Sequence, residues 1–159
     1  MLLRIENIPE KKLVGKRMNM SFAANRTGEL WGSFMPHRRE ISNAIRSDFF
    51  SIEVYAQHFF DRFDPQAMFE KWAAVEVADL HSVPEKMETI ILPGGLYAVF
   101  LHKGTASSAP TTYNDIFRTW LPTSDYTLDD RPHFALMGAK YKGEDPDSEE
   151  EIWIPIKPK

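Results

Sequence analysis

The chain lacks the features that mark several common classes of protein. None of its 159 residues is cysteine, which excludes disulfide bonds and thiolate chemistry. No apolar run approaches the roughly 18 residues that a membrane helix needs. The chain also starts without the long apolar segment that is typical of a signal peptide. We therefore expect a soluble, cytoplasmic protein that has no contact with a membrane.

Basic residues are too few to form a surface that binds nucleic acid. The formal net charge is −4 and the pI is about 5.7. Proteins that bind nucleic acid usually need a basic face that displaces counterions from the phosphates. The only local basic cluster, His37-Arg38-Arg39, lies at the expected end of a helix, where cations interact favourably with the helix dipole. We expect no direct binding to nucleic acid.

Aromatic side chains are plentiful by contrast. They make up 13% of the chain, as 4 Trp, 5 Tyr and 11 Phe. Hydrophobic residues contribute 43% and charged residues 26%, which is typical of a globular protein. Part of the aromatic surplus belongs to an ordinary core. Flat, rigid side chains in a small domain also suit a pocket for an apolar or cationic ligand.

A repeated pattern divides the chain into two parts, about residues 1–80 and 81–159. Each part has a short strand, a proline-marked turn, a longer strand, a helix that ends in an aromatic-apolar-proline sequence, and two further strands. The expected strands cover residues 4–9, 11–20, 49–57 and 68–79, then 87–93, 96–103, 133–141 and 151–157. We predict a single α+β domain over residues 1–159, in which two tandem βαββ units form an antiparallel sheet of about eight strands with two helices.

The second helix has the clearer periodicity. Its apolar residues recur at helical spacing and form one stripe: Tyr113, Ile116, Phe117, Trp120 and Leu121. Thr112 and Asp115 have the spacing of a capping box, in which both side chains bond exposed N–H groups of the first turn. Pro122 is expected to end the helix.

Several segments resemble the GyrI-like, AraC-type effector-binding family. They are Leu-Pro-Gly-Gly-Leu-Tyr-Ala-Val-Phe-Leu-His-Lys-Gly at residues 92–104, Trp-Leu-Pro-Thr-Ser-Asp-Tyr at 120–126 and Glu-Ile-Trp-Ile-Pro-Ile at 151–156. Residues 74–79 and 83–87 are similar to the stand-alone branch, which includes integron-associated effector-binding proteins. The similarity spans nearly the whole chain.

This resemblance implies two SHS2-like βαββ modules around a pseudo-twofold axis, with a ligand pocket between the sheet and the helices. In relatives this pocket takes amphipathic, often cationic, compounds. Family members include ligand-sensing parts of transcription regulators, a gyrase inhibitor and hydrolases of cyclopropane-bearing natural products. The five histidines lie far apart and form no metal-binding motif, so we expect neither a metal ion nor a cofactor.

One position departs from the family pattern. The family commonly has a glutamate in a Pro-x-Phe-Glu sequence after the second helix, and Ala135 takes that place here. A buried carboxylate attracts a cation because little water competes with it. Glu53 is the natural substitute, because it lies on the equivalent strand of the first part and shares a face with Ser51 and Tyr55. The alternative, that this face is simply solvated, stays open.

The residues that we expect to bind ligand are mainly aromatic. For each single aromatic residue, core packing is the alternative to ligand contact. No catalytic residue is expected. The candidates are Trp31, Glu53, Tyr55, Tyr97, Tyr113, Phe117, Trp120, Phe134, Ala135 and Trp153.

Three functions fit these observations. The first, which we favour, is a stand-alone domain that senses or sequesters a small hydrophobic or cationic molecule, in transcription regulation or drug resistance. The second is a hydrolase of strained natural products, for which Glu53 and Tyr55 are the only visible catalytic options. The third is an inhibitor that binds gyrase or another protein partner. The absence of the family glutamate at Ala135 weakens the case for an enzyme.

Overall fold

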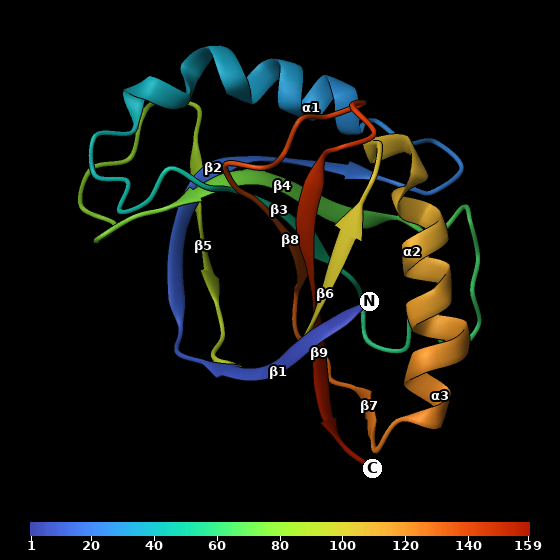
Figure 1. Ribbon diagram of the computed structural model, residues 1–159. Helices are drawn as coiled ribbons and strands as arrows, with labels where there is room; N and C mark the ends of the chain where they lie inside the picture. The colour runs from blue at the N-terminus through green and yellow to red at the C-terminus, as the bar shows by residue number, and fades with distance from the viewer.

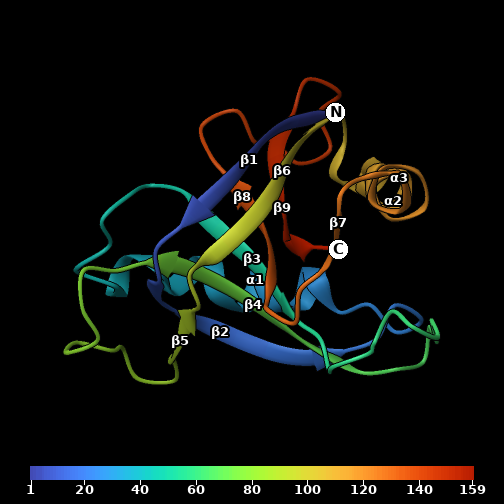
Figure 2. The same ribbon diagram turned by 90° about the horizontal axis from the view of Figure 1, so that it is seen from below.

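The computed structural model describes residues 1–159 and contains nine β-strands. All the paired strands are antiparallel, and they form one strongly twisted sheet (Figure 1, Figure 2). None of the helices is long and apolar enough to cross a membrane. The strands are β1 Leu2–Ile8, β2 Lys11–Met20, β3 Phe49–Val54, β4 Phe69–Glu76, β5 Glu88–Leu92, β6 Gly95–Lys103, β7 Tyr126–Leu128, β8 His133–Met137 and β9 Glu149–Pro158.

The two halves of the chain meet at the centre of the sheet. The strand order is β1-β6-β9-β8-β3-β4-β2-β5, so that β3 of the first half pairs with β8 of the second. Ser51 lies opposite Ala135 in this central pair. The short first strand of each half is exchanged, because β1 pairs with β6 and β5 pairs with β2. The predicted α+β fold with an antiparallel sheet is confirmed.

The structure adds one strand to the eight that the sequence pattern predicts. This strand, β7, pairs with β9 and places Leu128 opposite Ile156. In the first half an isolated bridge between Ala44 and Val77 takes the corresponding place beside β4. A three-residue strand is too short for alternation along the chain to reveal it.

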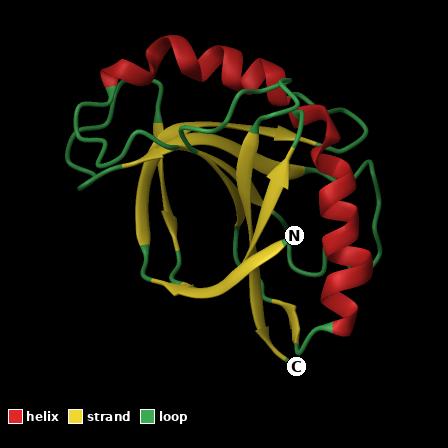
Figure 3. Cartoon of the chain, in the orientation of Figure 1, coloured by secondary structure: helices red, strands yellow, loops and turns green.

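The helices lie against one face of the sheet, one helical segment over each half (Figure 3). The first segment is α1, Thr27–Phe34, which continues into the 3-10 turn η1, Met35–Glu40. The second begins with the 3-10 turn η2, Ala106–Ser108, and α2, Ala109–Asp115. It then passes through a π-helical stretch η3, Ile116–Trp120, into α3, Leu121–Thr123.

The start of the second helix differs from the prediction. The helix begins at Ala109, with Pro110 in its first turn, and no side chain caps it. Proline is common at this position because its fixed φ angle suits a helix. An N–H group there would have no partner within the helix, so its absence costs nothing. The hydroxyl of Thr112 is instead 2.7 Å from Nδ1 of His102, so the predicted capping box is wrong.

The end of the second helix also lies beyond the predicted residue. Pro122 is inside the last turn, α3, and does not end the helix. Proline normally leaves a carbonyl of the preceding turn without its N–H donor. Here the hydroxyl of Thr123 donates to the carbonyl oxygens of Thr119 and Trp120, at 2.9 and 3.1 Å. This hydroxyl satisfies carbonyl groups of the last turn, which have no N–H donor further along the helix.

Both faces of the central strands are buried. Phe50 and Ile52 of β3 belong to the core on the face away from the helices. Phe49 and Tyr55 pack in the core beneath α1. Because side chains alternate along a strand, Glu53 also points toward the helices, and only 8% of it is exposed. The alternative of a solvated face is therefore excluded.

A close approach of β2 to β4 gives a first test of this sheet. A Cβ atom on Gly15 would lie 2.0 Å from the carbonyl oxygen of Ala73, so we expect Gly15→Ala to lower the free energy of unfolding by about 1–3 kcal/mol. Gly28→Ala in α1 is the control, because a Cβ atom at that position would have no neighbour within 4 Å. This change should raise the free energy of unfolding by at most about 1 kcal/mol. Urea unfolding followed by Trp fluorescence measures both. Equal stability of Gly15→Ala and the wild type would contradict the close approach.

Candidate ligand-binding site

A buried carboxylate without a full set of partners lies on the helix side of the sheet. One oxygen of Glu53, Oε1, is 3.5 Å from Nζ of Lys71, which lies opposite it on β4. The other oxygen, Oε2, is buried and has no hydrogen-bond partner. Burial raises the pKa of Glu53, and Lys71 lowers it in part. An unsatisfied buried acceptor is costly, so this oxygen is available to a donor or a cation.

A cluster of aromatic rings from both halves of the chain includes Tyr55, two residues from Glu53 on the same face, and His133, the strand partner of Glu53. Tyr55 and Phe60 come from the connection between β3 and β4, Phe117 from η3 and His133 from β8. The ring centroids of Tyr55 and Phe60 are 4.7 Å apart, those of Tyr55 and His133 are 4.9 Å apart, and Phe60 stacks on Phe117 at 5.1 Å. Aromatic faces carry a negative quadrupole that attracts cations.

Two further ionisable side chains share this buried region. Burial raises the pKa of Tyr113 in α2 well above its ordinary value, and the charges of Glu53 and Glu150 raise it further. Burial also raises the pKa of Glu150 in β9, while His102 and Lys71 lower it. Tyr113 therefore stays neutral and offers a hydroxyl donor, and Glu150 supplies a second acid.

His133 does not contribute positive charge at neutral pH. Burial, followed by the charge of Arg131, lowers its pKa to about 3. The imidazole is therefore neutral and does not compete with a cation for the carboxylates. With buried acids, neutral phenols and aromatic rings, this region is suited to an apolar molecule that carries positive charge.

A family comparison agrees with this geometry. The model of the GyrI-like small molecule binding domain matches residues 1–157. This chain belongs to the GyrI-like family. The resemblance seen in the sequence is confirmed.

One curated relative of this GyrI-like chain is a transcriptional regulator. The chain is 29% identical over 154 residues to the transcriptional regulator BrlR of Pseudomonas aeruginosa. The match covers 96% of this chain and 54% of BrlR. The chain therefore spans about half the length of this curated relative.

Solved structures share the fold at low sequence identity. SAV2435 bound to tetraphenylphosphonium has a TM-score of 0.71 at 15% identity, over 97% of this chain and 93% of that one. The integron cassette protein VCH_CASS2 of Vibrio cholerae has a TM-score of 0.67 at 13% identity, over 97% and 95% of the two chains. A hydrolase encoded by lin2189 of Listeria innocua has a TM-score of 0.62 at 12% identity, over 97% and 91%.

Half of the residues predicted to bind ligand lie in the Glu53 region, on the helix side of this GyrI-like domain. They are Glu53, Tyr55, Tyr113, Phe117 and Ala135, and Ala135 faces the helices because its strand partners Ser51 and Ile152 do. The predicted set omits Phe60 and Glu150. Strand alternation from Ile152 would have placed Glu150 on this face, but no pattern in the loop identifies Phe60.

Two predicted tryptophans lie in the helical segments, away from Glu53. Trp31 of α1 packs edge-on against Phe49, with ring centroids 6.1 Å apart. Trp120 of η3 packs edge-on against Phe100 at 5.0 Å and stacks on Tyr126 at 6.4 Å. Both residues hold a helical segment on the sheet.

Three other predicted residues lie on the opposite face of the sheet. Phe134 stacks on Trp153 with ring centroids 5.1 Å apart and meets Tyr97 at 5.3 Å. Adjacent residues of a strand point to opposite faces, so Phe134 and Ala135 are not able to share one site. The hydroxyl of Tyr97 donates to the carbonyl oxygen of Pro132 at 3.0 Å, which anchors it in the core.

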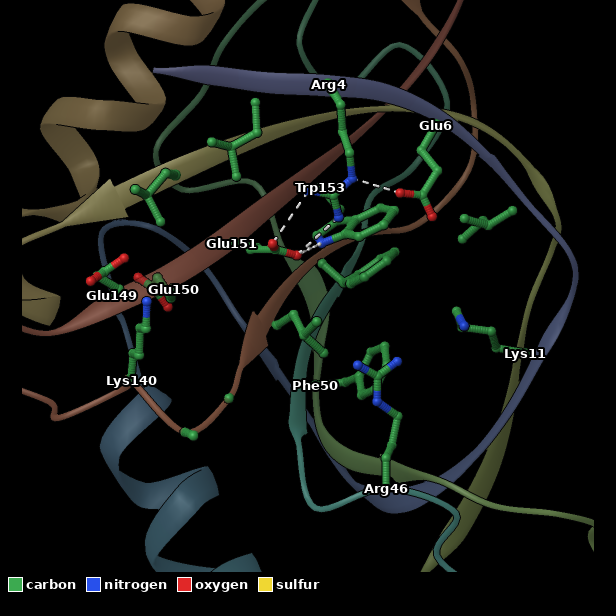
Figure 4. A pocket seen from close by; sticks show the side chains of 17 residues that line it. Arg4, Glu6, Lys11, Arg46, Phe50, Lys140, Glu149, Glu150, Glu151 and Trp153 are labelled. Atoms are coloured by element: carbon green, nitrogen blue, oxygen red, sulfur yellow. Dashed lines mark hydrogen bonds and ion pairs between the residues drawn. The ribbon is translucent and has the colours of Figure 1, made fainter.

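An open cleft of about 620 Å³ lies on this opposite face, beneath β1 (Figure 4). Phe134 and Trp153 form part of its lining. Arg4 at its edge is 2.6 Å from Glu6 and 3.4 Å from Glu151. These pairs are largely solvated. We therefore place the candidate site on the helix side, where Glu53 has an unused oxygen.

Proposed function

We propose that this chain binds amphipathic organic cations between the sheet and the helices. Glu53 supplies the opposite charge, and Tyr55, Phe60 and Phe117 supply the aromatic walls. The observation that carries the proposal is the buried Oε2 of Glu53, which has no partner of its own. A ligand cation that approaches this oxygen removes the cost of leaving it unsatisfied.

The surroundings of Glu53 strengthen its interaction with a cation. Charges buried away from water are screened much less than charges at the surface. Each cation–π contact adds about 0.5–2 kcal/mol, with the larger values in desolvated sites. A single weak acid in such a place is therefore sufficient to distinguish a cation from a neutral or anionic compound of the same shape.

Exposed aromatic residues connect the site with the surface. Phe22 and Phe63 are 43% and 55% exposed, and their ring centroids are 5.5 Å apart. Phe22 also stacks on Tyr55 at 6.4 Å, and Tyr55 contacts Phe60 at 4.7 Å. We propose that a ligand enters along these rings and displaces Phe60, because side chains fill the space over Glu53.

The ligand named for SAV2435 supplies a suitable probe. Tetraphenylphosphonium combines a single positive charge with four phenyl groups, which matches an acid surrounded by aromatic rings. Tetraphenylborate has nearly the same shape and the opposite charge. A pair of this kind separates the contribution of charge from that of apolar contact.

Isothermal titration with this pair tests the proposal. We expect tetraphenylphosphonium to bind and tetraphenylborate not to bind. Glu53→Gln should weaken the binding of tetraphenylphosphonium about tenfold to a hundredfold, since one buried charge interaction is worth roughly 1–3 kcal/mol. The matched control is Glu88→Gln, because Glu88 is an exposed strand residue that pairs with Arg17. Equal binding of both ions, or no effect of Glu53→Gln, would rule the proposal out.

We propose a role in sensing or sequestering such cations. The similarity to about half of BrlR, a transcriptional regulator, supports a ligand-sensing role. A domain that binds a toxic cation also lowers the free concentration of that cation by mass action. Both roles need the same site, so the titration above tests their common basis.

The second candidate function is hydrolysis of a strained natural product. The observation that favours it is the raised pKa of Glu53 beside Tyr55 and Tyr113, since a buried carboxyl group of this kind is able to act as a general acid. Product formation from a cyclopropane-bearing compound, absent in Glu53→Gln, would identify such an activity. Binding to gyrase or another protein partner stays a prediction from the sequence.

A further inference from the structure

The strand β1 lies at one end of the sheet and has a free edge. It is the first strand in the sheet order and pairs only with β6 (Figure 2). Its other edge therefore offers a row of backbone N–H and C=O groups that have no strand beside them. A free edge of this kind is a template for pairing with a strand of another chain.

The side chains of β1 alternate between the two faces of the sheet. Ile5 packs against the core on the helix side, whereas Arg4 and Glu6 line the cleft on the opposite face. Arg4 and Glu6 are 41% and 40% exposed. Leu2 and Leu3, at the beginning of the strand, are exposed large apolar residues. The strand thus presents apolar and charged side chains to the solvent as well as its backbone.

The charges of β1 do not protect this edge against a second copy of the chain. Proteins commonly protect an edge strand with charges, above all lysine, or make the strand very short. β1 is seven residues long and carries one charge of each sign, Arg4 and Glu6. The edge strand at the other end of the sheet, β5, has five residues, and its only charged residue is Glu88. β1 is therefore the edge better suited to pairing with itself.

The sequence of β1 selects one register for such a pairing. A twofold axis perpendicular to the sheet pairs two copies of the strand antiparallel and keeps each side chain on its own face. With the axis at Ile5, Arg4 of each copy lies opposite Glu6 of the other, and the two Ile5 side chains meet. An axis at Arg4 or at Glu6 would place two like charges opposite each other, which is unfavourable.

We propose that the chain forms a homodimer in which the β1 strands of two copies pair antiparallel about Ile5. Within one chain Arg4 is already 2.6 Å from Glu6, and the dimer adds a second neighbour of opposite sign to each charge. Most soluble homo-oligomers are closed twofold dimers with a self-complementary interface. One strand per copy is a small interface, so we expect weak association.

This dimer goes beyond the proposed ligand binding and does not depend on it. Three strands, β6, β9 and β8, separate β1 from β3, which carries Glu53. The interface therefore lies away from the candidate ligand-binding site. We expect the dimer to form without ligand.

Analytical ultracentrifugation of the untagged protein tests the dimer. Over concentrations from about 10 μM to about 1 mM, we expect the wild type to change from monomer to dimer. Arg4→Glu and Glu6→Arg each place like charges opposite each other at two positions of the interface. Each variant should weaken association about tenfold or more, because two favourable cross-strand pairs become repulsive.

Mixing the two single variants separates pairing between chains from effects within one chain. In a mixed dimer of Arg4→Glu with Glu6→Arg, each acidic side chain again lies opposite a basic one. The equimolar mixture should therefore form dimers at concentrations at which neither variant does alone. A role of these side chains within one chain does not produce this recovery, and circular dichroism checks the fold of each variant.

A matched change at the other edge of the sheet is the control. Glu88→Arg alters the charge of β5 as Glu6→Arg alters that of β1, and it should leave the dimer intact. A wild type that stays monomeric over the whole concentration range would overturn the proposal. Dimers that persist in both single variants, a mixture that stays monomeric, or loss of the dimer in Glu88→Arg would also overturn it. Binding of tetraphenylphosphonium, measured on the same variants, should not change, so this proposal and the proposed function fail separately.

Discussion

When the pH falls from about 7.5 to about 4.5, the His133→Phe variant is expected to lose about 3 kcal/mol less free energy of unfolding than the wild type loses. The folded protein holds the pKa of His133 at about 3, and the ordinary value is 6.5. Between these two values the unfolded chain binds a proton that the folded chain does not bind. The contribution of His133 is therefore complete above about pH 6.5 and decreases as the pH falls toward 3.

The buried acids act in the opposite direction over part of this range. Burial raises the pKa values of Glu53 and Glu150, so their protonation stabilises the folded protein as the pH falls. The wild type thus shows the sum of opposing effects, and the difference between wild type and His133→Phe isolates the histidine. Phenylalanine also preserves an aromatic ring beside Tyr55 and Phe117.

Urea unfolding at the two pH values measures this difference. His81→Gln is the control, because His81 is exposed. This variant should lose as much stability in acid as the wild type does. If His133→Phe lost as much stability in acid as the wild type, the imidazole would not be held neutral by burial. A neutral His133 also matters for function, because a charged one would oppose the approach of a ligand cation.

Patterns that are local to each half predicted the individual strands and helices of the fold. Proline-marked turns, alternating strands and the apolar stripe that includes Ile116 and Phe117 each reflect contacts between residues close in sequence. The exchange of β1 and β5 depends on pairing between residues far apart, for example Leu13 with Ile90. No local pattern specifies such a pairing, so the sequence predicted the elements better than their order in the sheet.

The candidate site was only partly predictable for the same reason. Alternation placed Ser51, Glu53 and Tyr55 on one face, but it did not tell whether that face was buried, because helices cover it from elsewhere in the chain. The contact of Glu53 with Lys71 depends on the register of β3 against β4 across a long connection. Residue type alone grouped Phe134 with Ala135, although neighbours on a strand point to opposite faces.

Introducing a carboxylate at the family position tests the site from the second half of the chain. Ala135 is only 4% exposed and lies opposite Ser51, two residues from Glu53 on the same face. We expect Ala135→Glu to raise the affinity for tetraphenylphosphonium about tenfold to a hundredfold, because it adds a poorly solvated charge near the ligand. The empty protein should become less stable, since an unpaired buried carboxylate loses its hydration and raises its own pKa.

The same change in a Glu53→Gln background separates position from charge. The double variant moves the acid from β3 to β8 and keeps the net charge of the site unchanged, so binding of tetraphenylphosphonium should recover. Ala135→Gln is nearly the same size as Ala135→Glu but uncharged, and it should produce no gain in either background. Isothermal titration of these six proteins, with Ala, Glu or Gln at position 135 in each background, with tetraphenylphosphonium and tetraphenylborate gives the comparison. If Ala135→Glu failed to increase cation binding in both backgrounds while Glu53→Gln weakened it, the ligand would contact β3 without reaching β8, and the pocket would belong to the first half alone.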